Sequence, residues 1–175
     1  MAILETARLT LRPFCQDDLD PLSALMANPD FMRFSLGVRT REETAAFLSK
    51  IMGWDHAGRP SPFAVILRES STLAGFCGFL HQEVDGVEEI EIAYRLHPDH
   101  WNKGIATEAT QAVRDHAFRV LALPCVISLI HPENAASRRV AQKMGMTMER
   151  ETTFRGFPAQ VYAIRREAWS ARCGA

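Results

Sequence analysis

EIAYRLHPDHWNKGIATEATQA, residues 91–112, joins an apolar segment of strand type to an alanine-rich segment of helical type through a polar turn. Gly104 stands in that turn beside Lys103, directly before the helical segment. The first turn of a helix has backbone N–H groups without intrahelical partners and a partial positive charge, and a glycine lets the backbone approach a ligand closely. The turn therefore favours an anion site, although a glycine before a helix is also common as turn chemistry alone.

Two familiar phosphate-binding motifs are missing from the sequence. There is no GxxxxGK(S/T) loop, and the window around Gly104 reads NKGIATEA rather than GxGxxG. A nucleoside triphosphate or a dinucleotide is therefore not favoured as the ligand.

The composition is that of an ordinary globular protein, for which we expect one domain over residues 1–175. The 20 basic and 21 acidic residues give a formal net charge of −1, so neither nucleic acid nor a membrane is expected as a partner. No apolar run is long enough to span a bilayer, and the opening residues do not form a secretory signal. These features predict a cytoplasmic protein.

The cysteines and histidines favour no disulfide and no metal. Four widely spaced cysteines without a CxxC pair are expected to be reduced thiols, with Cys77 and Cys125 buried in apolar segments. His97 and His100 lie beside a proline turn without a third ligand, so no metal site is expected.

The N-terminal part of the sequence predicts a strand followed by two helices. Residues 8–13 alternate in polarity, as in a strand with one buried face, and residues 19–26 have apolar side chains at helical spacing. Thr40 and Glu43 fit a capping box for a second helix, because each side chain can satisfy the other residue's free backbone N–H.

The rest of the sequence alternates between strands and helices. Three apolar runs predict an antiparallel meander. A helical stripe from Ala109 to Val120 follows Gly104. After it we expect a strand, a helix that ends at Gly145, and a last strand with a tail. The three runs are residues 62–69, 73–82 and 87–96, and the later elements are residues 124–131, 136–144 and 160–169. One α/β domain with a mixed sheet is therefore expected.

Residues 91–112 resemble the cofactor-binding core of the GNAT superfamily of N-acetyltransferases, in particular the branch of the ribosomal-protein N-terminal (alanine and serine) acetyltransferases. The pyrophosphate loop of the superfamily is written Q/R-x-x-G-x-G/A, and that of the branch commonly W-G-x-G-x-A. Here Trp101, Gly104 and Ala106 match the branch pattern, whereas Asn102 replaces its first glycine. Asparagine tolerates a left-handed backbone better than most residues, so the loop can keep its shape.

Three further segments resemble the same branch in the same order. LETARLTLRPFCQDDLDPLSAL, residues 4–25, matches its opening T-x-R-L-x-L-R strand and helix. HPENAASRRVAQKMGM, residues 131–146, matches its N-x-x-S helix, and VYAIRREAW, residues 161–169, matches its closing strand. The resemblance thus covers nearly the whole chain.

The resemblance implies a single GNAT-like domain of the α/β (α+β) class. Its sheet would be mixed and mostly antiparallel, with about seven strands, a splayed parallel central pair and helices on both faces. Acetyl-CoA would bind in the notch of that pair, its pantetheine arm along the strand backbone at residues 92–96 and its pyrophosphate at residues 102–107. The residues implied in cofactor binding are Ile92, Ala93, Tyr94, Arg95, Leu96, Trp101, Asn102, Lys103, Gly104, Ile105, Ala106, Thr107, Asn134 and Ser137.

Two residues are candidates for catalysis. By the resemblance, the Ser137 hydroxyl would protonate or hydrogen-bond the departing thiolate, although Asn134 and Ser137 also fit an ordinary helix start. A base, or a water chain, must take the proton of the amine, and Glu91 lies closest to the expected thioester. Glu88, Glu89 and Glu91 also fit a solvated strand end.

The expected activity is transfer of an acetyl group from acetyl-CoA to a primary amine by direct attack, without an acetyl-cysteine intermediate. The acceptor would be a protein N-terminus, a polyamine, an amino-sugar antibiotic or another small amine. A non-catalytic acyl-CoA-binding regulatory module is the alternative, and both a monomer and a homodimer remain open.

Overall fold

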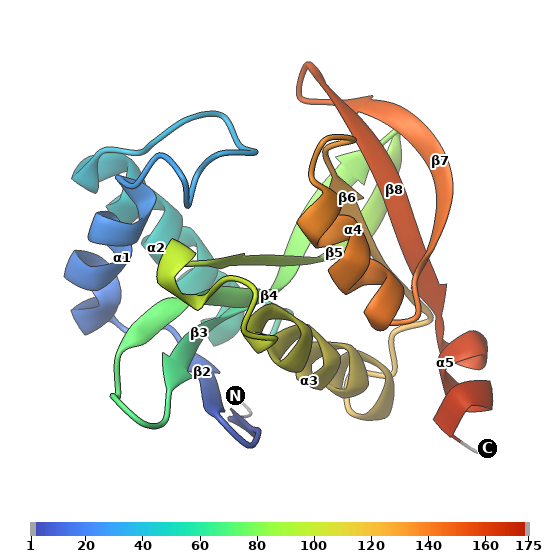
Figure 1. Cartoon of the computed structure of the whole chain (residues 1–175), viewed down its shortest axis with the longest axis horizontal. Helices are drawn as coiled ribbons and strands as arrows, with labels where there is room; N and C mark the ends of the chain where they lie inside the picture. The colour runs from blue at the N-terminus through green and yellow to red at the C-terminus, as the bar shows by residue number, and fades with distance from the viewer. Residues whose placement is uncertain (1–2, 174–175) are drawn as a thin grey trace.

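The computed structural model describes residues 3–173, with side chains through residue 171. One eight-stranded sheet runs through it in the order β1-β2-β3-β4-β5-β6-β8-β7 (Figure 1). Only β5 and β6 are parallel neighbours; the other neighbours are antiparallel. The strands are β1 (Leu4–Glu5), β2 (Leu9–Pro13), β3 (Pro62–Leu67), β4 (Leu73–Val84), β5 (Val87–Leu96), β6 (Cys125–Ile130), β7 (Thr147–Phe154) and β8 (Phe157–Arg165).

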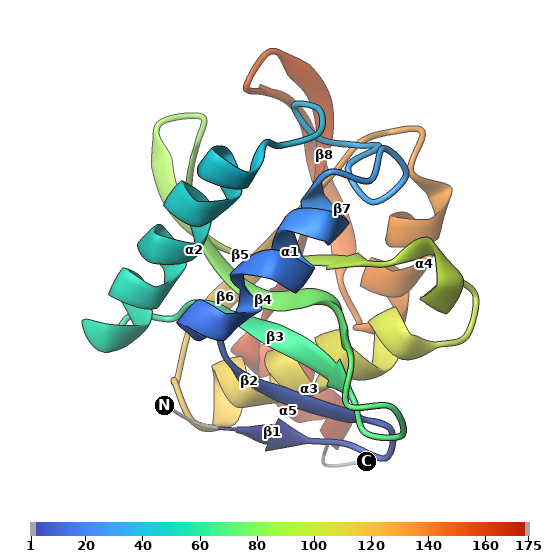
Figure 2. The same cartoon turned by 90° about the vertical axis from the view of Figure 1, so that its left-hand side faces the viewer.

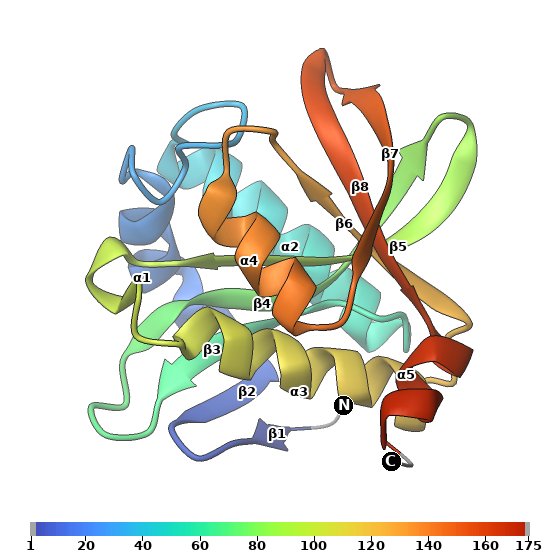
Figure 3. The ribbon, with the colours of Figure 1, turned by 45° about the vertical axis from the view of Figure 1, so that its right-hand side comes forward.

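Helices cover both faces of the sheet. Figure 2 shows α1 and α2 on one side, and Figure 3 shows α3 and α4 in front of the sheet with α2 behind it. The helices are α1 (Leu19–Met26), α2 (Arg41–His56), α3 (Ile105–Arg119), α4 (Ala135–Lys143) and α5 (Arg166–Cys173), with short 3-10 turns at Gln16–Asp18 and Pro98–His100. The predicted α/β domain with a mixed, mostly antiparallel sheet is confirmed.

Two apolar clusters hold these layers together. The larger one lies between the sheet and α3 and includes Phe63, Phe79, Ile92 and Val113. The smaller one lies on the opposite face, where α1 and α2 cover Phe76. Burial of this apolar area is the main favourable term in folding.

Local signals in the sequence explain several element boundaries. Thr40 Oγ1 accepts a hydrogen bond from Glu43 N (3.2 Å), and Glu43 carboxylate accepts one from Thr40 N (2.8 Å), which confirms the capping box of α2. Asp85 and Gly86 form the two-residue turn of the β4–β5 hairpin with φ of 53° and 79°. Such turns require positive φ at both positions, which these residue types tolerate.

The parallel pair separates after a single point of contact. Glu91 of β5 is in register with Ile127 of β6, and no other pair joins the two strands within the described residues. Beyond that pair, β5 continues toward the loop before α3, while β6 stays with β8 and β7 (Figure 1). The implied splayed pair is therefore present, and the region between the two diverging strand ends is called the notch below.

The sheet has eight strands, in line with the expected number of about seven, and the tail after β8 forms the helix α5. Two expectations need correction. The predicted helical stripe ends too late, because α3 stops at Arg119 and Val120 is 67% exposed. Cys77 is buried as expected, but Cys125 is only half-buried. No helix in the described part of the chain is long and apolar enough to cross a membrane.

Candidate functional site

The β5 edge that faces the notch presents the backbone of alternate residues. His97 N donates to Ala74 O of β4 (2.8 Å), whereas Ile92 O accepts from the Ser128 hydroxyl of β6 (2.8 Å). Because backbone groups alternate in direction along a strand, Tyr94 and Leu96 share the edge of Ile92. Trp101 Nε1 donates a hydrogen bond to the Leu96 carbonyl oxygen (2.8 Å), so this oxygen already has a partner. This leaves the Tyr94 backbone and the Leu96 N–H facing the notch.

Ala93 and Arg95 do not fit the backbone role implied for them. Both residues are in register with β4, opposite Gly78 and Phe76. By the same alternation, their backbone groups point to β4 and pair within the sheet. Their side chains lie on the face of the sheet that α1 and α2 cover.

The loop between β5 and α3 has two residues in the left-handed conformation. Asn102 has a φ of 58° and Gly104 a φ of 76°. Asn102 therefore adopts the left-handed backbone that an asparagine tolerates. A Cβ atom at Gly104 would meet only the flexible end of Arg8, at 3.4 Å, so positive φ rather than lack of space requires the glycine.

The start of α3 is a suitable place for an anion. The helical hydrogen bonds begin with Glu108 N, which donates to Gly104 O (3.0 Å). The N–H groups of residues 102–107 have no recorded acceptor within the described part of the chain. Lys103 is exposed next to them, and a cavity of about 390 Å³ lined by Lys103, His100 and Arg68 adjoins the loop. These free donors and the positive helix end fit a pyrophosphate.

Thr6 and Arg8, before β2, hold this helix start in place. Glu108 accepts hydrogen bonds from Arg8 N (2.9 Å), Arg8 Nε (2.7 Å) and Thr6 Oγ1 (2.6 Å). Arg8 also donates to Lys103 O (2.8 Å). No local sequence pattern indicates this role, because about a hundred residues separate the partners, although Thr6 and Arg8 belong to the quoted T-x-R-L motif.

Asn134 and Ser137 lie across the notch from β5, at the start of α4. Asn134 is the N-cap, and its side-chain oxygen accepts from Ser137 N (3.1 Å), so the capping interpretation holds for Asn134. The Tyr94 hydroxyl donates to Ser137 O (3.1 Å) and so connects β5 with α4. Burial raises the pKa of Tyr94, so its phenol stays protonated at neutral pH. The sequence alone did not single out this hydroxyl, because an aromatic residue in a strand is usually a core residue.

Glu91 differs from the two other carboxylates near it. Glu88 is exposed and Glu89 half-exposed, as at a solvated strand end, whereas Glu91 is 7% exposed. Its carboxylate accepts hydrogen bonds from Gln82 Nε2 (2.7 Å) and Leu129 N (3.3 Å). Burial raises the pKa of Glu91, and the hydrogen bond from Gln82 opposes that effect. A carboxylate with a raised pKa is better suited to act as a base near neutral pH.

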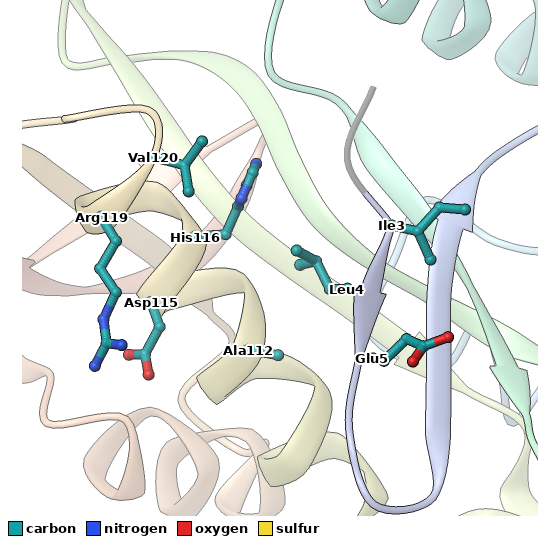
Figure 4. A pocket seen from close by; sticks show the side chains of 8 residues that line it. All are labelled: Ile3, Leu4, Glu5, Ala112, Asp115, His116, Arg119 and Val120. Carbon is teal, nitrogen blue, oxygen red and sulfur yellow. The ribbon is translucent and has the colours of Figure 1, made fainter.

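The thiols and histidines form no second centre in the described part of the chain. Burial raises the pKa of Cys77, which makes it a poor nucleophile. His97 Nδ1 accepts from Asp99 N (3.2 Å) and so stabilises a turn. No group of three or more possible metal ligands gathers among residues 3–171. A cavity of about 330 Å³ between β1 and α3, shown in Figure 4, is lined by His116 and Asp115 and lies away from the notch.

Comparison with known proteins agrees with this geometry. A family model described as an acetyltransferase (GNAT) domain matches residues 8–147. The chain therefore belongs to the GNAT acetyltransferases. It is an N-acetyltransferase whose acetyl donor is acetyl-CoA.

Individual relatives support the assignment over the full chain. YnaD of Bacillus subtilis (strain 168), an uncharacterized N-acetyltransferase, is 32% identical over 174 residues, which cover 95% of this chain and 99% of YnaD. A GNAT-family acetyltransferase of known structure from Bacillus anthracis is 30% identical with a TM-score of 0.79, covering 95% of this chain and 99% of that one. RimL, a ribosomal L7/L12 α-N-protein acetyltransferase solved with coenzyme A, has a TM-score of 0.80 over 95% of this chain and 99% of its own. It is only 20% identical and shows the fold alone.

Proposed function

We propose that the protein transfers the acetyl group of acetyl-CoA directly to a primary amine bound on the α1–α2 side of the notch. The observation that carries this proposal is the separation of β5 from β6 at Glu91, directly before a loop with free N–H groups and two left-handed residues. The strand edge can receive an extended pantetheine arm, and the loop can receive its pyrophosphate. Bound acetyl-CoA supplies a thioester, whose carbonyl carbon an amine can attack.

The residues around the notch have separate roles in binding acetyl-CoA. Tyr94 and Leu96 offer backbone groups to the arm, Trp101 holds the end of β5 to the loop, and the amides of residues 102–107 with Lys103 hold the phosphates. Asn134 contributes through its side chain at the facing helix start. Ala93 and Arg95 support this edge from inside the sheet.

Glu91 is the proposed base and acts directly or through one water. Its carboxylate lies at the point where the strands separate and is held by Gln82 and Leu129. An ionised Glu91 can accept the proton that the attacking amine must lose. The hydrogen bonds fix the orientation of the carboxylate, which keeps it available at one place in the notch.

Ser137 is the proposed partner of the departing thiolate. Its hydroxyl makes no hydrogen bond recorded within the described residues, whereas its N–H and carbonyl are taken by Asn134 and Tyr94. The hydroxyl is therefore free to donate to sulfur. The protonated Tyr94 hydroxyl lies one hydrogen bond away from the same residue and can support this role.

Both a protein N-terminus and a small-molecule amine fit this chemistry. An α-amine with a pKa of roughly 7.7 to 8 is partly neutral near pH 7, which suits attack on a thioester. The resemblance to the ribosomal-protein branch supports a protein N-terminus. The small-molecule alternative is supported by arginines on the face of the sheet that α1 and α2 cover, where we place the amine and which we call the acceptor face.

The test combines cofactor binding with turnover. Acetyl-CoA should raise the free energy of unfolding by roughly 2.7 kcal/mol at a hundredfold excess over its Kd, whereas NAD and ATP should have much smaller effects. A thiol-release assay over a panel of amines should then show acetyl-dependent release with at least one acceptor. Release of no thiol with any amine, despite tight coenzyme A binding, would instead support the non-catalytic module.

A further inference from the structure

Three arginines from separate segments lie near one another on the acceptor face, and two of them, Arg95 and Arg155, interact with Glu91. Arg95 is on β5, Arg39 lies between α1 and α2, and Arg155 is at the β7–β8 turn. Electrostatic interactions link Arg39 to both Arg95 and Arg155, and link Glu91 to Arg95 and Arg155. Figure 1 shows the α1–α2 connection and the β7–β8 turn extending to the same side of β5. The fold therefore brings three positive charges together beside the proposed base.

None of these arginines has an ion pair with a carboxylate in the described part of the chain. Arg95 donates to two backbone carbonyls, Phe31 O (3.2 Å) and Phe34 O (3.4 Å). Arg39 lies over the Phe47 ring at 4.9 Å. In contrast, the six arginines that do form ion pairs with carboxylates are Arg8, Arg12, Arg41, Arg114, Arg150 and Arg165.

Arg155 connects to the base through one side chain. Its Nη2 donates to Gln82 Oε1 (3.1 Å), and Gln82 Nε2 donates to Glu91 (2.7 Å). Arg155 has a φ of 50° in a two-residue turn with Gly156. Asn, Asp and Gly are the usual residues at such turn positions, so turn formation does not explain an arginine here.

The nearby carboxylates do not neutralise this cluster. Glu91 is the buried carboxylate already held by Gln82 and Leu129. Glu43, which also faces Arg39, uses its carboxylate to cap α2 at Thr40. These hydrogen bonds leave the charge of each carboxylate in place, so Glu91 and Glu43 offset two of the three guanidinium charges and one positive charge remains in excess. Guanidinium groups bind carboxylates through paired hydrogen bonds.

The acceptor face is also partly covered. The Phe34 ring stacks on the His131 ring with a centroid distance of 5.5 Å, which joins the α1–α2 connection to the segment after β6. Arg95 holds the same connection through Phe31 and Phe34. This contact joins segments from the two halves of the sheet beside Arg95, a position at which it would limit the size of an acceptor.

We propose that the acceptor is a small primary amine that carries a carboxylate, such as an amino acid, and that Arg39 and Arg155 bind this carboxylate while the amine faces Glu91. This inference rests on the proposed function, because it requires the amine to approach the notch from this face. Arg95 serves as a positioning residue that holds the α1–α2 connection.

The experiment compares an amino acid with its primary amide and with the amine that lacks the carboxyl group. Rates are compared per neutral amine, because these changes also alter the pKa of the amine. The native protein should prefer the amino acid. Arg39→Gln should raise KM for the amino acid by at least about tenfold, with little change for the amide or for coenzyme A affinity. Arg155→Gln should raise the same KM by at least about tenfold, but because Arg155 also holds Gln82 its kcat should fall with both acceptors, so this variant is judged by the ratio of the two KM values. Arg59→Gln is the matched control, because Arg59 also lies over a ring, that of Trp54 at 5.8 Å, but outside the cluster.

The outcomes separate this inference from the proposed function. Equal use of the amino acid and its amide, with equal effects of the arginine variants on both, overturns the carboxylate site and leaves the acetyl transfer intact. If no amine releases thiol, the proposed function fails, and calorimetric binding of the amino acid to coenzyme A-saturated protein tests the site without turnover. Binding that disappears in Arg155→Gln supports the site, and equal or absent binding in both proteins overturns it.

Discussion

The hydroxyl of Tyr94 on β5 donates a 3.1 Å hydrogen bond to the backbone carbonyl of Ser137 in the first turn of α4. This bond connects β5 with the start of α4 and places the backbone of Ser137 beside a buried phenol. The helix cap belongs to Asn134, which accepts from the Ser137 N–H. Stability and catalysis can therefore be separated by changing these residues one at a time.

Ser137→Ala should lower turnover by about tenfold or more and leave coenzyme A affinity unchanged, because the lost interaction belongs to the transition state. Its free energy of unfolding should stay within about 0.5 kcal/mol of the native value, since the capped group is the backbone N–H. Asn134→Ala is the matched variant and should cost about 1 kcal/mol. Chemical denaturation and steady-state kinetics measure the two effects, and unchanged turnover in Ser137→Ala would remove the thiolate role.

Gly104→Val should weaken coenzyme A binding by at least about tenfold, because a β-branched residue does not tolerate the φ of 76° that the loop requires. Gly104→Asn should keep more of the affinity, since asparagine adopts the left-handed conformation more readily. Isothermal titration calorimetry gives both values. Equal affinities for all three proteins would mean that the loop does not hold the cofactor.

Glu91→Gln should keep cofactor binding but reduce turnover by a factor of roughly 100 at neutral pH. The loss should shrink as pH rises, because more of the acceptor amine is then already neutral. In the native protein, the raised pKa means that Glu91 becomes protonated at a higher pH than an ordinary glutamate. As the pH is lowered, the rate should therefore begin to fall at a higher pH than it would with a base of ordinary glutamate pKa. Native-like turnover of Glu91→Gln across this pH range would show that Glu91 is not the base.

Glu108→Gln should lower coenzyme A affinity by loosening the start of α3, although Glu108 need not touch the cofactor. Desolvation acts to raise the pKa of Glu108, but hydrogen bonds from Thr6 and Arg8 outweigh it and lower the pKa. The stability that this group adds is present above its unfolded-state pKa and is lost as pH falls through the lower folded-state pKa. A double-mutant cycle with Arg8→Gln should give a coupling energy of about 0.5 to 1 kcal/mol. Additive effects would show that the two side chains act independently.

Most helices and strands of the fold could be predicted from sequence patterns within a single segment. The strands of the meander, the capped start of α2 and the left-handed loop before α3 each depend on residues close together in sequence. β7 was not predicted, because TMERETTF contains no apolar alternation and lies largely exposed at the sheet edge. Strand pairing with β8, rather than burial of its own side chains, defines that element.

The candidate site could be predicted only where one segment supplies its parts. The cofactor loop and the α4 start are continuous motifs, so their residues could be named from the sequence. The link from Arg155 through Gln82 to Glu91 joins three strands or turns, and no local pattern indicates it. The same holds for Arg39 and Arg95, whose proximity arises from the way the α1–α2 connection crosses the sheet.

The contacts of Thr6 and Arg8 with Glu108 have a practical consequence for handling the protein. A truncation that removes these two residues would spare every strand from β2 onward, yet it would release the helix end that receives the phosphates. We therefore expect the segment before β2 to influence cofactor affinity through the start of α3, and shortened forms should be compared by their coenzyme A binding as well as by their melting.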